Sequence, residues 1–372
     1  MADKKIRVLV VDDTVIYRKI VSDILGTMPQ VEVVGSANNG KIAMSLIEQK
    51  RPDLLILDVE MPEADGLEVL AFIQKKKLQV GAVMLSSFTQ KGSQRTIKAL
   101  ELGAFDFIPK PESRSIEESK RAVQGDLNRV VEAFIRQAEI KHLLHQRGPS
   151  TGHRSATAPI LATPVTTPRR AGQTTSNIVT IGISTGGPNA LKEVLPKLPG
   201  NLGVPVLVVQ HMPPVFTKSL ADSLNRRCAL DVMEATEGQI VTPNQVLIAP
   251  GGKQMKVVLA PDKAKRIIKL TDDPPENGCR PAVDYLFRSI SQLYGGRVTA
   301  VVMTGMGCDG KLGMKLLKRQ GALTIAQDES TCVVYGMPKE VIEAGLADVV
   351  APLPSIADEI CKTVKRNQAV MA

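Results

Sequence analysis

The sequence predicts two α/β domains, each built on a doubly wound parallel sheet. Short β-branched runs alternate with amphipathic segments over residues 6–110, and the alternation starts again at residue 177. Such alternation is typical of βα units and therefore of parallel sheets. Between the two, residues 146–176 are rich in Pro, Ser, Thr, Gly and Ala and show no hydrophobic period, which predicts a flexible linker.

Five strands are expected in the first domain, and they occur in the runs "IRVLVVDD", "VEVVGSA", "DLLILDVE", "VGAVMLSS" and "AFDFIPK". Helical patterns separate them near residues 15–27, 39–50, 65–77 and 91–102. A last helix, from about residue 115 toward 145, is longer than packing against one sheet requires.

The second domain is expected to begin with strands at "NIVTIGIS", "VPVLVVQH" and "DVMEAT". Three closely spaced runs follow, "QVLIAP", "MKVVLA" and "RIIKLT", with no room for helices between them, and they predict an antiparallel hairpin insert. Alternation then resumes with "VTAVVMTG", "ALTIAQD" and "ADVVAP", and helices are expected near residues 282–294, 310–320, 338–345 and 354–367.

Composition excludes several classes of protein. The net charge of +9 is spread thinly, and the chain has no Trp, so binding to nucleic acid is not expected. No apolar run approaches the ~20 residues of a membrane span, and the N-terminus lacks a signal peptide's cleavage site, so a soluble cytoplasmic protein is expected. None of the five cysteines forms a Cys-x-x-Cys pair, so neither a zinc site nor a disulfide framework is expected.

Polar side chains end several strands of the first domain. Asp12 and Asp13 end the first strand, Asp58 the third, Ser86 the fourth and Lys110 the fifth. Ligands bind at this edge of open parallel sheets, and three carboxylates suit Mg²⁺ while a lysine suits phosphate. Capping of the following helix is an alternative role, which fits Asp13 but not Asp58.

The motifs "VLVVDD", "LLILDVEMPEADGLEVL", "VMLSS" and "IPKP" resemble a two-component receiver domain over about residues 5–125. The resemblance implies a flavodoxin-like fold. It also implies a phosphate-accepting Asp58, a Mg²⁺ site of Asp12, Asp13 and Asp58, and switch residues Ser86, Phe107 and Lys110.

In the second domain, Ser184 occupies a Gly-x-Ser-x-Gly pattern after an apolar run. The pattern is typical of a nucleophile elbow, although a glycine-rich turn before a helix could also hold phosphate. A serine nucleophile needs a base, and His211 is the one histidine beyond residue 153. It ends the next strand along the chain, so we expect the two at the same sheet edge.

A serine and its base also need an acidic residue that orients the base, and this third member of a catalytic triad is harder to choose. Asp309 lies in a glycine-rich turn after a buried strand, while Asp284 and Asp328 are rivals, the former expected on a solvated helix face. The order Ser, His, Asp differs from that of an α/β-hydrolase. Cys308 is an alternative nucleophile, disfavoured because the neighbouring carboxylate discourages a thiolate.

The motifs "GISTGGP", "VVQHMPPVFTKSLADSLN", "CRPAVDYLF" and "MTGMGCDGKLGM" resemble the catalytic domain of chemotaxis protein-glutamate methylesterases over about residues 177–367. The same family carries an N-terminal receiver. The resemblance implies a nucleophile, base and acid at Ser184, His211 and Asp309, with Thr185 and Met306 beside the oxyanion. Ile183 and Cys308 depart from the family pattern, where a smaller residue and an amide are expected.

The function expected from these resemblances is that of a phosphorylation-activated serine hydrolase in chemotactic adaptation. It would demethylate glutamate methyl esters on the cytoplasmic helices of chemoreceptors, releasing methanol, and the same chemistry would deamidate glutamine. A histidine kinase would supply phosphate, Mg²⁺ would serve phosphorylation only, and ester hydrolysis would need no cofactor. The expected domains are a receiver (1–125), a helix and linker (126–176) and a catalytic domain (177–370).

Two other functions fit parts of the sequence. A receiver-linked transcription regulator or other non-catalytic binding protein would need a helix-turn-helix with a basic recognition helix, which the second domain does not display. A phosphate-binding module using the turn at 185–190 would leave His211 without a role.

Overall fold

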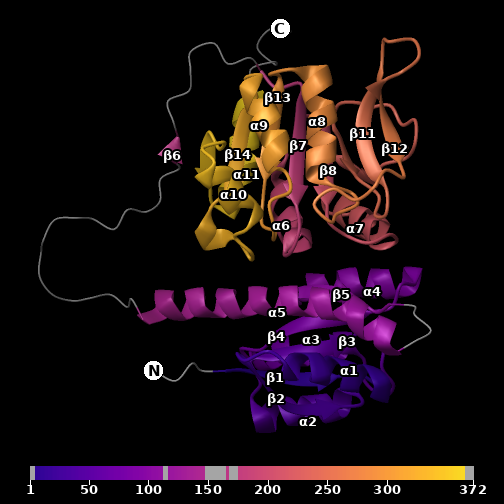
Figure 1. The fold of residues 1–372 in the computed structure, drawn as a ribbon, viewed down its shortest axis with the longest axis vertical. Coiled ribbons are helices and arrows are strands. Elements are labelled where there is room, and N and C mark those ends of the chain that lie inside the picture. Colours follow the sequence, from indigo (N-terminus) through magenta and orange to yellow (C-terminus); the bar gives the residue numbers. More distant parts are fainter. Residues whose placement is uncertain (1–4, 112–115, 147–164, 167–174, 365–372) are drawn as a thin grey trace, which may run out of the picture. The chain divides into compact units, whose positions relative to one another are not determined.

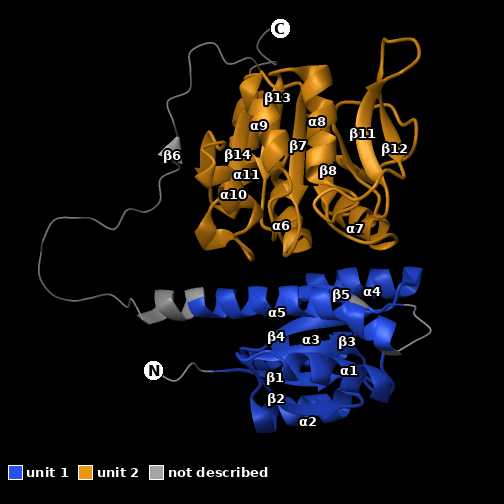
Figure 2. Cartoon of the chain, viewed as in Figure 1, with its two compact units in different colours: residues 1–148 blue, residues 149–372 orange. Residues whose placement is uncertain are grey.

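The computed structural model describes residues 5–111, 116–146, 165–166 and 175–364. The chain forms two compact units, Met1–Gly148 and Pro149–Ala372 (Figure 2). Of the predicted linker, most residues lie outside the described part of the chain; the exceptions include the two-residue strand β6 (Val165–Thr166).

The first unit has one five-stranded parallel sheet with the order β2-β1-β3-β4-β5, as the receiver resemblance predicts. Its strands are β1 (Ile6–Val11), β2 (Val31–Ala37), β3 (Leu54–Asp58), β4 (Gly81–Ser86) and β5 (Asp106–Pro109). Its helices are α1 (Val15–Gly26), α2 (Gly40–Lys50), α3 (Gly66–Lys76), α4 (Gln90–Glu101) and α5 (Ile116–Gln146).

Burial explains why the central strands of this unit read as continuous apolar runs. Every residue of β3 is buried, as are the last four of β1, because helices cover both faces of the sheet. On α5, Val123, Leu127 and Val130 recur at helical spacing and pack into the same core as α1. The polar strand ends are thereby held on a rigid frame.

The second unit has an eight-stranded sheet with the order β6-β15-β14-β13-β7-β8-β10-β9, and β6 is antiparallel to its neighbour. Strands β14, β13, β7 and β8 of this sheet are labelled in Figure 1 from left to right. The remaining strands are β7 (Ile178–Ile183), β8 (Val206–Gln210), β9 (Asp231–Glu234), β10 (Gln245–Ile248), β13 (Val298–Val302), β14 (Leu323–Gln327) and β15 (Val349–Ala351). The helices are α6 (Gly187–Val194), α7 (Phe216–Asn225), α8 (Val283–Tyr294), α9 (Lys311–Arg319), α10 (Met337–Glu343) and α11 (Ile356–Val364), with 3₁₀ turns at Leu195–Lys197, Glu329–Thr331 and Leu353–Ser355.

The hairpin insert is smaller than the sequence predicts. Only β11 (Gln254–Leu259) and β12 (Arg266–Thr271) pair as an antiparallel hairpin. The first of the three predicted runs forms β10, which lies parallel between β8 and β9 in the main sheet. The prediction is wrong there because a loop over residues 235–244, without a helix, is long enough to join two parallel neighbours.

Capping residues set several helix starts. The Asp65 carboxylate accepts from the Glu68 N–H at 2.9 Å, and the Glu68 carboxylate accepts from the Asp65 N–H at 2.8 Å, which forms a capping box before α3. By contrast α6 and α7, which the sequence patterns did not predict, begin without a side-chain cap. Among the described helices, none combines the length and apolar character that a membrane crossing requires.

Candidate functional sites

Three neighbouring strands of the second unit end at one place. In the parallel pair β7 and β8, Ile183 lies opposite Gln210, and the His211 N–H donates to the Ile183 carbonyl at 3.1 Å. On the other side of β7, the Ser184 N–H donates to the carbonyl of Thr304, just beyond β13, at 3.0 Å. Ser184 and His211 therefore follow directly on adjacent strands, as the sequence predicts.

The backbone around Ser184 is tightly held. Gly186 has a φ of 75°, in the left-handed region that favours glycine, and the Gly187 N–H donates to the Ser184 carbonyl at 2.7 Å. The Gln210 side-chain amide donates to the same carbonyl at 2.9 Å. A Cβ on Gly305 would lie only 2.7 Å from the Ser184 Cβ, so the strand after β13 packs directly against the serine.

Backbone donors lie beside the serine. Within the described residues, the N–H groups of Thr185, Gly186 and Met306 donate to no other protein atom. Ser184 and Thr185 are nearly buried, with 5% and 6% of their surfaces exposed, whereas Met306 is half-buried. Such donors are what an oxyanion would require, and two of them are the residues that the sequence analysis placed there.

Asp309 holds His211 by one ring nitrogen. Its Oδ2 lies 2.8 Å from Nε2 of the histidine, and only 2% of the aspartate is exposed. The carboxylate also accepts from four other donors, the N–H groups of Val283, Asp284 and Gly310 and the side-chain amide of Asn277. Burial raises the pKa of Asp309, but the hydrogen bonds from His211 and the backbone outweigh it, so the pKa is lowered and the carboxylate stays ionised.

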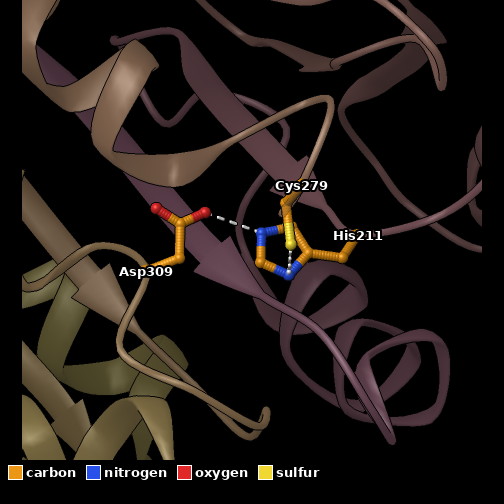
Figure 3. Close-up of side chains that lie close together, drawn as sticks. All are labelled: His211, Cys279 and Asp309. Carbon is orange, nitrogen blue, oxygen red and sulfur yellow. Dashed lines mark hydrogen bonds and ion pairs between the residues drawn. The ribbon is translucent and has the colours of Figure 1, made fainter. Parts of the chain in front are cut away.

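The other ring nitrogen of His211 faces a thiol. Nδ1 lies 3.5 Å from Sγ of Cys279 (Figure 3). Burial lowers the pKa of His211, but the bonds to Asp309 and Cys279 outweigh it and raise that pKa to about 9. Nε2 is engaged by the carboxylate, so Nδ1 is the nitrogen available to accept a proton. No hydrogen bond joins Ser184 to His211 in the described part of the chain.

Sequence reasoning missed Cys279 and Asn277, which lie in the loop before α8. They are separated from His211 and Asp309 by 68 and 32 residues, so no local spacing could have indicated these contacts. The motif "CRPAVDYLF" marked the segment without giving the thiol a role.

The rival acids have other partners. Asp284 is 2% exposed, not on a solvated face as predicted, because its Oδ1 accepts from the Gly313 N–H and its Oδ2 from the Asn277 amide. Burial raises its pKa to about 6. Asp328 accepts from the Thr331 N–H and caps a 3₁₀ turn. Neither is bonded to His211 among the described residues, and the rival nucleophile Cys308 is exposed.

The first unit brings its predicted acids together as well. Carboxylate oxygens of Asp12, Asp13 and Asp58 lie within 4.8 Å of one another, and Lys110 Nζ lies 2.6 Å from both Asp12 and Asp58. Burial raises the pKa of Asp58 to about 6, against the opposing effect of Lys110. The one ammonium pairs with two of the three carboxylates, so the remaining negative charge and the all-oxygen donor set fit Mg²⁺.

Of the predicted switch residues, Ser86 adjoins this site, because the Lys110 N–H donates to its carbonyl at 2.7 Å. Ser86 is buried, and its hydroxyl is hydrogen-bonded to Thr96 on α4, which joins the end of β4 to that helix. Phe107 on β5 is buried too. Tyr17, which the sequence analysis did not single out, donates its hydroxyl proton to the Pro111 carbonyl at 3.0 Å. The centroid of its ring lies 4.8 Å from Lys110 Nζ, a cation–π contact. It therefore helps to hold the lysine in place.

Both units match models of known protein families. The family model described as CheB methylesterase matches residues 179–360, and the response regulator receiver domain matches residues 8–119. Among solved structures, the Thermotoga maritima CheB methylesterase catalytic domain is 43% identical, with a TM-score of 0.49, and covers 51% of this chain and 99% of its own. The response regulator domain of Thermotoga maritima CheB is 36% identical, with a TM-score of 0.31, and covers 35% of this chain and 98% of its own.

Related sequences match this chain over nearly its whole length. A protein of Desulfotalea psychrophila named protein-glutamate methylesterase/protein-glutamine glutaminase is 52% identical over 365 residues, which cover 97% of this chain and 99% of the relative. A protein of the same name from Clostridium acetobutylicum is 40% identical, with coverage of 97% and 99%. The chain therefore belongs to the family of protein-glutamate methylesterases/protein-glutamine glutaminases in which a response regulator receiver precedes the CheB methylesterase domain.

Proposed function

We propose that this protein hydrolyses glutamate methyl esters on chemoreceptors, under the control of receiver phosphorylation, and that it thereby serves sensory adaptation. The observation that carries the proposal is the Asp309–His211 pair, 2.8 Å apart, at the sheet edge where Ser184 sits in its glycine turn. A serine, an imidazole and a buried carboxylate are the groups that acyl transfer needs.

In the proposed reaction Ser184 Oγ attacks the ester carbonyl and transfers its proton to His211 Nδ1. Asp309 stabilises the imidazolium through Nε2. The negative charge on the tetrahedral intermediate is stabilised by the backbone N–H groups of Thr185 and Met306, which donate to no other atom of the described residues. The imidazolium returns its proton to the departing methoxide, and methanol leaves. Water, deprotonated by Nδ1, then attacks the acyl-enzyme; the Ser184 Oγ–acyl bond breaks, and the imidazolium returns its proton to Oγ as glutamate leaves.

The same steps would convert receptor glutamine into glutamate, with ammonia as the leaving group. The names of the relatives, which join methylesterase and glutaminase, support this second substrate. An amide is a poorer substrate than an ester in such a site because its nitrogen must be protonated to leave.

In the first unit, Asp58 is the proposed phosphate acceptor and a histidine kinase of the chemotaxis system the donor. Asp12, Asp13 and Asp58 would hold Mg²⁺, which would neutralise charge on the transferring phosphoryl group. Lys110, already 2.6 Å from Asp58, would bind a phosphoryl oxygen. Ser86 and Phe107 would respond to the phosphate. Ester hydrolysis itself would use no cofactor.

We place the reaction in the cytoplasm, on the cytoplasmic helices of the receptors.

The experiment that tests the esterase proposal is covalent labelling with an organophosphonate, followed by peptide mass analysis, alongside methanol release from methylated receptor. Label on Ser184 with parallel loss of methanol release is the expected result. Methanol release that continues with Ser184 fully labelled would rule the serine out, and a chain without methanol release or label would favour a binding role.

A further inference from the structure

The thiol of Cys279 is held against the ring of His211. Its Sγ lies 3.5 Å from Nδ1, the nitrogen that Asp309 leaves available. The residue closes a turn in which Cys279 and Glu276 exchange backbone hydrogen bonds of 2.8 and 3.1 Å, and the Gln254 amide donates to the Cys279 carbonyl at 3.3 Å. The backbone that carries the sulfur is therefore held by three hydrogen bonds.

The separation of these two atoms matches the edge of a tetrahedral metal site. Zinc bonds of about 2.3 Å to sulfur and about 2.0–2.1 Å to nitrogen, at a tetrahedral angle, put the two ligand atoms about 3.6 Å apart. The observed distance is 3.5 Å. Sγ and Nδ1 could therefore bind one ion with little movement of either chain segment.

The outer contacts of His211 also suit a metal ligand. A histidine that binds zinc usually donates its second ring N–H to a carboxylate, which fixes the ring and makes the ligating nitrogen more basic. His211 makes such a bond: its Nε2 lies 2.8 Å from Asp309 Oδ2, which accepts the ring N–H, and the carboxylate is itself held by backbone donors. Ligand atoms of His211, Cys279 and Asp309 all lie within 4.8 Å of one another.

We propose that Cys279 Sγ and His211 Nδ1 form an inhibitory binding site for Zn²⁺. A thiolate with an imidazole selects a borderline or soft cation, unlike the all-oxygen site around Asp58, which suits Mg²⁺. Both atoms lose their protons on binding, and water fills the remaining positions. The ion would occupy the nitrogen that must accept the Ser184 proton, so binding and hydrolysis exclude each other. Only the inhibition rests on the proposed function; the binding does not.

Binding is tested on the full chain with Co²⁺ as the spectroscopic probe, in the presence of Mg²⁺. A thiolate-to-cobalt absorption band is expected, and Zn²⁺ should abolish it. Cys279→Ser should remove the band, and His211→Ala should shift or remove it. Cys308→Ser is the matched control, since Cys308 is more exposed and adjoins Asp309, and it should keep the band. Circular dichroism of each variant shows whether it is folded.

Inhibition is tested by titrating Zn²⁺ against methanol release, with each variant measured relative to its own zinc-free rate. The Zn²⁺ concentration for half-inhibition should rise on the order of 10-fold or more in Cys279→Ser, and a chelator should restore the uninhibited rate. Equal sensitivity in Cys279→Ser and Cys308→Ser, or a band that survives in folded Cys279→Ser, would overturn the proposal. A Cys279-dependent band without any methanol release would refute the esterase and leave the site standing.

Discussion

At the scale of single residues, the hydrogen bonds of Asp309 explain why it can orient His211. The first N–H groups of α8, from Val283 and Asp284, point at its carboxylate, where the positive end of a helix dipole favours negative charge. Asp284 binds the backbone of Gly313 on the neighbouring helix instead. Two buried carboxylates thus have separate roles, one toward the histidine and one toward the packing of α9.

Substitution should separate these two carboxylates. Asp309→Ala should lower kcat/KM for methanol release by on the order of 10³-fold, as should Ser184→Ala and His211→Ala. The double variant of serine and histidine should lose little more than either single one, because the groups act as a unit. Asp284→Asn, the control, should lose far less activity. A nearly active Asp309→Ala beside an inactive Asp284→Asn would show that the acid is misassigned.

The raised pKa of His211 makes a prediction about pH. The histidine is a base only when its ring is neutral, and its pKa is raised from 6.5 to about 9, so kcat/KM should increase with pH well above the usual histidine range. Asp309→Asn removes the charge that stabilises the imidazolium, so the rising limb should move to lower pH. The profile is measured from about pH 5 to 10. If kcat/KM of the unsubstituted protein instead rises with a pKa at or below 6.5, the ordinary value for histidine, the hydrogen bonds of His211 do not raise its pKa.

At the scale of elements, the site depends on how closely the ends of β7 and β13 approach. Gly305 follows β13, and its carbonyl accepts from the Met337 N–H at the start of α10 at 2.8 Å. A Cβ at this position would lie 2.5 Å from Met337 Sδ and 2.7 Å from Ser184 Cβ. The sulfur ends a flexible chain, but the serine Cβ is fixed to its backbone and cannot move away.

Gly305→Ala should therefore displace the serine. We expect a loss of about 10²-fold in the rate of methanol release, and a lower free energy of unfolding by about 1–3 kcal/mol. Gly125→Ala is the control, because this exposed position in α5 has no atom within 4 Å of an added Cβ. It should keep the rate and stabilise the helix by about 1 kcal/mol. Urea unfolding and initial rates measure both; an unchanged rate in Gly305→Ala would disprove the close packing.

At the scale of the whole molecule, the chain is two units, each with a hydrophobic core of its own. A receiver can change the rate of a second unit only by binding its active and inactive states differently. A tenfold change in rate needs a coupling free energy of only about 1.4 kcal/mol. Phosphorylation at Asp58 need not distort the triad to control it.

The sign of this coupling can be measured. We expect a fragment from residue 177 onward to release methanol faster than the resting full chain, and phosphorylation in the presence of Mg²⁺ to raise the rate of the full chain by about tenfold. Asp58→Asn should abolish the response, as should removal of Mg²⁺. The three proteins are assayed together on methylated receptor. A fragment at or below the resting rate would mean that the phosphorylated receiver stimulates the site instead of ceasing to restrain it.

The amino-acid sequence alone predicts the alternation of strands and helices, the acidic edge of the receiver sheet, and the position of Ser184 and His211 after adjacent strands. These depend on local hydrophobic period and on strand ends, which neighbouring residues dictate. Only the folded chain shows that β10 joins the main sheet and that Asp284 is buried. The same holds for the contacts of His211, whose Nε2 is hydrogen-bonded to Asp309 and whose Nδ1 lies 3.5 Å from Cys279 Sγ. These features depend on the order of the strands and on contacts between residues far apart in the chain, such as Cys279 and His211, which are 68 residues apart. No local sequence pattern indicates which side chains come into contact over such a separation.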